Sequence, residues 1–256
     1  MTAHPLHLVR LRLESARLYS FAKHARLPAR DFDEGYAVHA LLAALFDHRA
    51  DATERLAPKP FAVRELQGRS MEVLGYSRAD RGALAARVEA FSDPVAHAAC
   101  DLRELASRPM PTEFDRGTRL GFHVRVCPVR RVAKRGNQLK DRAEVDAFLA
   151  RAWEVGEGVA LERESVYRGW LAEELKKDGA ASLVAAEMVQ YRRTRLHRRT
   201  SGEGRQGKRV EHPDVRFDGV LEVTDSAAFS SRLARGLGRH RAFGFGMLLL
   251  KPAPRT

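Results

Sequence analysis

Hydrophobic and polar residues alternate along the first half of the chain with two periods, one of two residues and one near 3.6. Residues 6–13 alternate as a strand does, and residues 35–47 repeat apolar side chains at helical spacing. The same patterns predict strands near 60–66 and 69–76, a helix over 79–91, an extended stretch over 100–107 and a strand over 119–127. This β-α-β-β-α-β order is typical of the ferredoxin-like fold, an antiparallel sheet with both helices on one face.

The second half partly repeats the pattern. It predicts helices over 142–153 and 165–177, an extended stretch over 183–197, a strand over 215–223, a helix over 226–235 that Asp225 caps, and a strand over 243–251. We therefore expect an α+β protein built from two tandem ferredoxin-like (βαββαβ) domains. Residues 1–128 form the first domain, 129–154 a basic linker with a bridging helix, and 155–256 the second domain.

Net positive charge is concentrated in two short segments. The chain carries 45 Lys and Arg against 33 Asp and Glu, a formal charge of +12. Residues 130–142 hold six basic residues and one Asp, and residues 191–209 hold eight basic residues and one Glu, so these segments account for the whole excess. Such a distribution indicates a surface for a polyanion. The alternative is a pair of solvated loops rich in Arg through codon bias, and an anionic membrane surface fits less well because neither segment has an apolar face.

Several classes of protein fit the composition poorly. Two cysteines, Cys100 and Cys127, are too few for a disulfide framework or a Cys-based zinc site, which suits a reducing compartment. No apolar run approaches the ~18 residues that a membrane span needs, and the N-terminus lacks the apolar stretch of a signal peptide. We expect a cytoplasmic protein without membrane contact.

Four glycines lie between a helix and an apolar strand in residues 235–246, RGLGRHRAFGFG. The segment is not a nucleotide-binding P-loop, because GxxxxGK[ST] is absent. It could simply stop the helix and make a sharp turn. Alternatively, Gly244 and Gly246 let backbone amides approach a phosphate, and Arg239 and Arg241 add positive charge.

This glycine segment resembles the C-terminal signature of CRISPR repeat-processing endoribonucleases, specifically the CasE branch of type I-E systems. Residues 35–46, 120–136 and 215–225 resemble that family in the same order. Processing enzymes of type IV systems are similar too. The resemblance implies two tandem ferredoxin-like domains of the RAMP type, and it implies binding and metal-free cleavage of the repeat stem-loop in precursor CRISPR RNA. It also implies a mature crRNA product and a place in a Cascade-like effector complex.

The resemblance assigns a Tyr and a His three residues apart on the first helix to Tyr36 and His39. Metal-free RNA cleavage uses the ribose 2′-OH as nucleophile, and an imidazole suits either proton transfer. A His beside a helix stripe is also commonly a packed or solvated residue. His24 is a competing catalytic candidate, and an arginine-dominated site with Arg241 is a further variant.

The candidate RNA contacts are basic residues of the loop before the first helix, of the two basic segments and of the glycine loop, with two glycines. They are Lys23, Arg26, Arg30, Arg130, Arg131, Lys134, Arg135, Arg192, Arg193, Arg195, Arg198, Arg199, Arg239, Gly244 and Gly246. Protruding arginines on a ribbon suit an RNA stem, because its major groove is too deep and narrow for a helix.

No metal and no cofactor are expected. The carboxylates of residues 31–34 are better explained as a helix cap than as a metal site, and the His residues follow no ligand spacing. Two other functions stay open: a non-catalytic RNA-binding RAMP subunit of a CRISPR effector complex, and a basic DNA-binding regulator. The regulator is disfavoured because no helix-turn-helix is recognisable.

Overall fold

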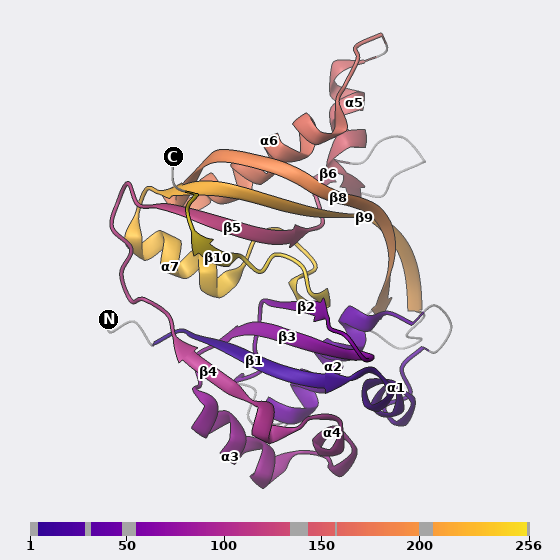
Figure 1. Ribbon diagram of the computed structural model, residues 1–256. Helices are drawn as coiled ribbons and strands as arrows, with labels where there is room; N and C mark the ends of the chain where they lie inside the picture. The colour runs from indigo at the N-terminus through magenta and orange to yellow at the C-terminus, as the bar shows by residue number, and fades with distance from the viewer. Residues whose placement is uncertain are drawn as a thin grey trace.

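Two antiparallel four-stranded sheets, each with its own helices, form the protein (Figure 1). The computed structural model describes residues 5–28, 32–47, 55–133, 143–156, 158–199 and 207–254. The α+β class predicted from the sequence is confirmed. Among these residues, no helix is both long enough and apolar enough to cross a membrane.

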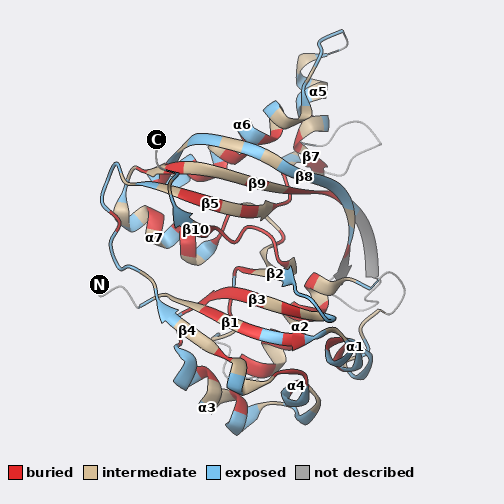
Figure 2. Ribbon diagram, in the orientation of Figure 1, coloured by how far each residue is buried: buried red, intermediate tan, exposed pale blue. Residues whose placement is uncertain are grey.

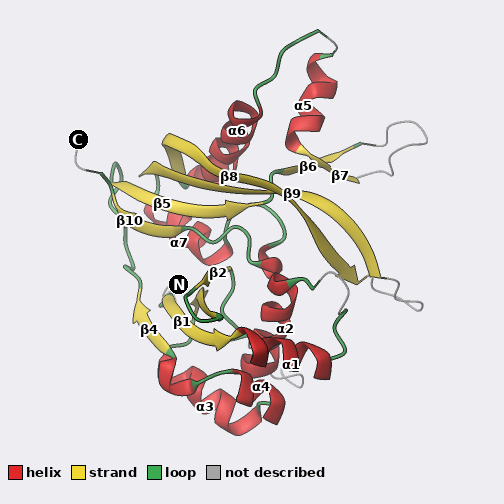
Figure 3. Ribbon diagram, turned by 45° about the vertical axis from the view of Figure 1, so that its right-hand side comes forward, coloured by secondary structure: helices red, strands yellow, loops and turns green. Residues whose placement is uncertain are grey.

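The first sheet has the strand order β2-β3-β1-β4. Its elements are β1 (His7–Glu14), α1 (Ser15–His24), α2 (Glu34–Phe46), β2 (Phe61–Glu65), β3 (Ser70–Ser77), α3 (Arg81–Phe91), α4 (Pro94–Ala99), the 3-10 turn η1 (Leu102–Glu104) and β4 (Ala106–Pro109). Alternate residues of β1 face the helices, so Val9, Leu11 and Leu13 are buried against the apolar stripe of α2 that includes Leu41 and Leu45. The helices cover one face of the sheet (Figure 3).

The second sheet has the strand order β10-β5-β9-β8. Its half of the chain contains β5 (Arg119–Val126), β6 (Val129–Val132), β7 (Ala143–Asp146), α5 (Ala147–Val155), α6 (Arg163–Lys176), η2 (Lys177–Gly179), β8 (Ala181–Arg199), β9 (Gly207–Val223), α7 (Ser226–Arg235), η3 (Arg241–Phe243) and β10 (Leu249–Pro252). Strands β8 and β9 pair along their whole length as a hairpin, the ribbon expected for the basic segment that begins at residue 191. Its outer end curves away from the sheet toward α1 and α2 (Figures 1 and 3).

The sequence prediction that residues 119–127 close the first sheet is wrong. Strand β5 pairs with β9 and β10, and the first sheet is closed by β4, which pairs with β1. The apolar face of β5, with Phe122, Val124 and Val126, packs into the second core. The division between the sheets therefore falls between β4 and β5 and not at residue 128.

Four local predictions also need correction. Residues 143–146, expected as the start of a helix, form β7 and pair with β6, so part of the predicted linker is a small sheet. Helix α1 was not predicted, because its buried side chains are few, and it includes Lys23 and His24, which were expected in a loop. The 100–107 stretch contains η1 before β4 begins. The apolar run from residue 243 is mostly not a strand, because residues 241–248 form η3 and a loop that sinks into the core.

The two halves pack directly on each other. The buried Tyr76 hydroxyl on β3 donates to the Leu248 carbonyl oxygen at 2.8 Å, and Leu74 and Tyr76 belong to the core of the second half. Burial raises the pKa of the Tyr76 hydroxyl, so the hydroxyl stays protonated and can donate this hydrogen bond. Buried segments face one another across the junction (Figure 2).

Candidate active site

Helix α2 begins at a side-chain cap that fixes the orientation of its first turns. The Asp33 carboxylate accepts a hydrogen bond from the Tyr36 backbone N–H at 2.9 Å. Tyr36 and His39 are both partly buried, and their three-residue spacing places them on one face of the helix. The sequence prediction that a carboxylate cap begins this helix is confirmed.

The glycine loop packs against the same first turn of α2. An ideal Cβ built on Gly35 would lie 2.3 Å from the Phe243 carbonyl oxygen, so the two backbones approach more closely than any side chain would allow. The Tyr36 ring stacks on Phe243, with ring centroids 5.8 Å apart and an interplanar angle of 22°. The turn η3, which carries Arg241, is therefore held next to the helix that carries His39.

A cluster of basic groups lies at this contact. Burial lowers the pKa of His39 below its ordinary value of 6.5, and the nearby charge of Lys59 lowers it further. Burial and the charge of Arg241 lower the pKa of Lys59. The pKa of Arg241 is itself lowered, by burial and then by Arg232. The three groups form one electrostatically coupled cluster, the "His39 cluster", made of His39, Lys59 and Arg241.

Beside this cluster the surface is hollowed. A cavity of about 330 Å³ is lined by Lys59 and by residues 238–243. Lys59 and Arg241 both line this cavity, where two cationic side chains can stabilise negative charge that develops on a phosphate. The arrangement fits phosphoryl chemistry on an anionic substrate.

His24 lies elsewhere and is not brought to this cluster. Its Nε2 atom is 3.8 Å from an oxygen of Asp93, the residue that caps α4, and its side chain is exposed. Lys23 and Arg26 are exposed near the end of α1. Arg30 lies outside the described residues. The roles predicted for these four residues remain predictions.

Close packing of the backbone explains why most positions of the glycine loop with glycine cannot hold a larger residue. Gly246 has φ +79°, and a Cβ there would lie 2.1 Å from the Leu237 carbonyl oxygen. Its own carbonyl accepts from Leu237 N–H, and its N–H donates to the Arg125 carbonyl. Gly244, at φ +80°, leaves ordinary contact distances around a Cβ, so its requirement is the left-handed backbone alone. These contacts favour the turn interpretation for Gly246.

Several of the arginines predicted to bind RNA already pair with acidic side chains of the protein. Arg192 donates to the Asp214 carboxylate at 2.6 Å, Arg193 lies 3.1 Å from Glu211, and Arg239 donates to the buried Glu144. Arg130 makes a bidentate pair with Glu173. Two of the remaining arginines, Arg131 and Arg195, are exposed. Lys134 and Arg135 lie outside the described residues, as do the side chains of Arg198 and Arg199.

Asp214 joins the basic hairpin to the second sheet. Its side chain is 1% exposed and accepts two hydrogen bonds from Arg125, each 2.8 Å, in addition to the bond from Arg192. Burial alone would raise the pKa of Asp214, but the hydrogen bonds and charges of Arg125 and Arg192 together outweigh burial, and the pKa is lowered. Glu34 at the start of α2 has a raised pKa, through burial and then Glu65, and it also senses Arg125 and Arg192.

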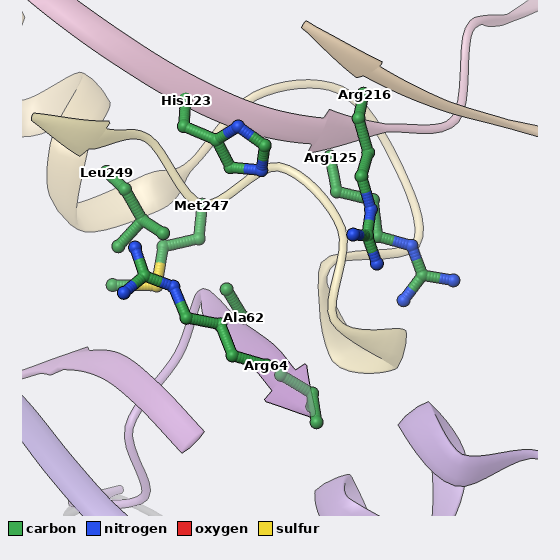
Figure 4. A pocket seen from close by; sticks show the side chains of 8 residues that line it. Ala62, Arg64, His123, Arg125, Arg216, Met247 and Leu249 are labelled. Carbon is green, nitrogen blue, oxygen red and sulfur yellow. The ribbon is translucent and has the colours of Figure 1, made fainter. Parts of the chain in front are cut away.

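A second recess lined by basic side chains lies between the two sheets (Figure 4). It has a volume of about 40 Å³ and includes Arg64 from β2, His123 and Arg125 from β5 and Arg216 from β9. Burial lowers the pKa of Arg216, and the charge of Arg125 lowers it further. The recess adds to the positive potential between the sheets.

Sequence reasoning missed three residues that build the site. Lys59 stands alone before Pro60 and belongs to no basic run. In the sequence, Gly35 resembles any residue at the start of a helix, and only its close contact with η3 in the structure shows why glycine is needed there. Asp214 lies directly opposite Arg192 in the β8–β9 register, so the cross-strand pairing of the hairpin is the signal that could have found it.

The chain matches a family and several solved structures. The sequence model of the family described as CRISPR associated protein matches residues 6–252. The CRISPR-associated endoribonuclease Cse3 of Thermus thermophilus is 32% identical over 148 residues, which are 57% of this chain and 61% of that protein. The aligned part of the chain thus spans about three fifths of this relative's length.

Structural similarity extends over nearly the whole chain. A structure of Cse3 bound to a 19-nucleotide RNA matches with a TM-score of 0.62 and 22% identity, covering 97% of this chain and all of that chain. Cas6e from Escherichia coli K-12 matches with a TM-score of 0.52 and 19% identity, covering 96% of this chain and all of that one. These similarities concern the fold. The family match confirms the resemblance found in the sequence, and the chain belongs to the family of CRISPR-associated proteins that includes Cse3 and Cas6e.

Proposed function

We propose that this protein is a metal-independent endoribonuclease that binds the repeat stem-loop of precursor CRISPR RNA and cleaves it to mature crRNA. The observation that carries the proposal is the packing of η3, with Arg241, against the first turn of α2, the helix of Tyr36 and His39, beside an open cavity lined by Lys59 and Arg241. Further support comes from the relative Cse3, which is named an endoribonuclease, and from its structure with an RNA that represents a pre-cleavage complex.

The proposed reaction is an attack of the ribose 2′-oxygen on the adjacent phosphorus. His39, neutral because its pKa is lowered, takes the 2′-OH proton as the new O–P bond forms. Lys59 and Arg241 stabilise the charge on the phosphorane. The bond from phosphorus to the 5′-oxygen then breaks, that oxygen takes a proton from water, and His39 returns its proton to solvent. The products are a 2′,3′-cyclic phosphate and a 5′-OH.

Each sheet with its helices is a ferredoxin-like unit in this proposal. If the four strands of each half are numbered 1 to 4 along the chain, both sheets have the spatial order 4-1-3-2. In both halves, helices follow strand 1 and strand 3. The first unit covers residues 7–109 and the second residues 119–252. The glycine loop of the second unit then completes an active site on the first helix pair of the first unit.

The RNA stem is proposed to lie along the basic hairpin. Its edge strand β8 is largely exposed (Figure 2), and the hairpin curves toward the half of the chain that carries His39 (Figure 1). A structure of a CRISPR RNA-guided surveillance complex matches this chain with a TM-score of 0.53 at 16% identity. We therefore include a Cascade-like effector complex among the proposed partners, together with the crRNA stem-loop.

Incubation of the full chain with a repeat hairpin RNA in excess EDTA tests the proposal. We expect cleavage at one position near the base of the stem. Tight binding without cleavage would instead favour the alternative function, a non-catalytic RNA-binding subunit. Cleavage that requires added Mg²⁺ would contradict the metal-independent mechanism.

The pH dependence of cleavage should report the lowered pKa of His39. A general base works in its neutral form, so kcat/KM is expected to rise with pH to a plateau, with the midpoint of the rise below the ordinary histidine pKa of 6.5. The measurement is kcat/KM across the pH range for wild type and His39→Ala, in which the acid limb should vanish. A wild-type rate that falls as pH rises through this region would assign His39 the role of acid.

RNA affinity is expected to fall steeply with salt, because basic side chains neutralise phosphates. Each phosphate contact adds somewhat under one unit to the slope of log K against log salt. Changing Arg193 and Arg195 to Gln should therefore flatten the slope by roughly one to two units. The control changes two exposed arginines on other elements, Arg103 and Arg151, whose partners are Asp101 and Glu154. An equal loss of slope in both double variants would remove the hairpin from the binding surface.

A further inference from the structure

Three side chains of the kind that bind transition metals converge behind the glycine loop. Cys127 follows β5, His212 lies on β9, and His240 immediately precedes η3. Their ligand atoms all lie within 4.8 Å of one another, and the three residues are 1%, 3% and 8% exposed. They come from distant parts of the sequence, so no local spacing signals them.

The backbone of His240 is held in an unusual conformation. It is left-handed, with φ 61° and ψ 24°, which a non-glycine residue adopts only when its surroundings enforce it. This conformation turns the imidazole into the core, where its centroid lies 4.6 Å from that of His212.

Glu144 supports the cluster from β7. One carboxylate oxygen is 2.9 Å from His240 Nε2, and the other accepts from Arg239. A carboxylate that binds the second nitrogen of an imidazole is the usual outer partner of a metal-bound histidine. With Nε2 engaged in this way, a metal would bind His240 through Nδ1.

We propose that Cys127, His212 and His240 form a Zn²⁺ site, with Glu144 as the residue that orients His240. One thiolate and two imidazoles are a donor set that zinc prefers, at roughly 2.3 Å for sulfur and 2.0–2.1 Å for nitrogen. Val129, Leu196 and Phe245 pack beside Cys127 and make its surroundings apolar. Binding releases the thiol proton of Cys127 and draws the three donors closer together.

The position of the site gives the metal a structural role. His240 directly precedes η3, whose Phe243 contacts the helix that carries His39, so a metal at His240 would hold η3 in place. The metal takes no part in the proposed cleavage step, so activity that is lost in EDTA and restored by Zn²⁺ but not by Mg²⁺ would report this structural site, whereas activity restored by Mg²⁺ would contradict the proposed cleavage mechanism. The sequence analysis expected no metal. This proposal changes that expectation only by adding a structural ion.

Titration of the chelator-treated full chain with Zn²⁺, by calorimetry, and with Co²⁺, by absorption, tests the site. We expect one ion per chain and, with Co²⁺, a thiolate charge-transfer band. The melting temperature should rise by roughly 5–10 °C at free Zn²⁺ about 100-fold above Kd. A wild-type chain that binds no Zn²⁺ would overturn the proposal, whatever its RNA cleavage.

Variants separate this site from adventitious binding. Cys127→Ser should lose the charge-transfer band, and Glu144→Gln should weaken Zn²⁺ binding roughly 10- to 100-fold. The control is Cys100→Ser, because Cys100 is the other buried free cysteine and belongs to the core of the first half. Unchanged Zn²⁺ affinity in Cys127→Ser would overturn the proposal, and so would an equal loss in Cys100→Ser. If Cys127→Ser fails to fold, the wild-type cobalt spectrum decides.

Discussion

Replacing His39 with alanine is expected to slow RNA cleavage by roughly 10²–10⁴-fold, the usual loss for one general acid or base. RNA affinity should stay within a few-fold of wild type, because the side chain is half-buried on α2 and the basic hairpin is untouched. Lys59 and Arg241 remain to stabilise the phosphorane, so residual activity is expected. Single-turnover cleavage and a separate binding titration measure the two effects.

His24→Ala is the matched control for this variant. His24 has the same side chain in the neighbouring helix α1, but it lies beside Asp93 and not beside Lys59. Its cleavage rate should be near that of wild type. A near-normal rate in His39→Ala with a slow His24→Ala would move the proton transfer to His24. Normal rates in both would favour a site dominated by Arg241.

Among the charged residues whose substitution we consider, Asp214→Ala is expected to lower the free energy of unfolding the most. The carboxylate is buried, and its removal leaves Arg125, whose side chain is 17% exposed, without its bidentate partner. Breaking a buried pair in this way costs about 3–5 kcal/mol, because the remaining charge is desolvated and unpaired. The melting temperature should fall by roughly 6–20 °C for a chain of this size.

Asp218→Ala on the same strand is the control. Asp218 also accepts from two side chains, His123 and Lys251, but it is 39% exposed. Such a pair contributes about 0–1 kcal/mol, so the variant should melt close to wild type. Thermal unfolding followed by circular dichroism compares the two variants. Equal melting temperatures would show that the Asp214 network does not stabilise the fold.

Local pattern was sufficient for most elements but not for their assembly. The stripe of α2, the alternation of β9 and the Asp225 cap on α7 are all local signals, and the structure confirms each of them. Alternation does not reveal which strand a segment pairs with, so β5 was assigned to the wrong sheet. Helix α1 buries so few side chains that its apolar stripe is too short to recognise.

The candidate site shows the same limit. Tyr36 and His39 were assigned through a resemblance, and charge pattern pointed to Arg241. Lys59 reaches the cluster through a tertiary contact that no spacing encodes. Arg192 was predicted as a phosphate contact, and the structure also gives it a partner, Asp214, which became visible once the hairpin register was known. The convergence of Cys127, His212 and His240 likewise requires the folded chain.

Cleavage of a repeat hairpin RNA that carries a single 2′-deoxynucleotide on the 5′ side of the cut tests the proposed mechanism most directly. The 2′-oxygen is the nucleophile in this account, so the deoxy substrate should bind normally and remain uncut in EDTA. The all-ribose substrate should yield a 2′,3′-cyclic phosphate and a 5′-OH, which mass spectrometry of the fragments identifies. Cutting of the deoxy substrate at the same position, or a 3′-OH at the end of the 5′ fragment, would contradict the assignment of this protein as an endoribonuclease that uses the 2′-OH of its substrate.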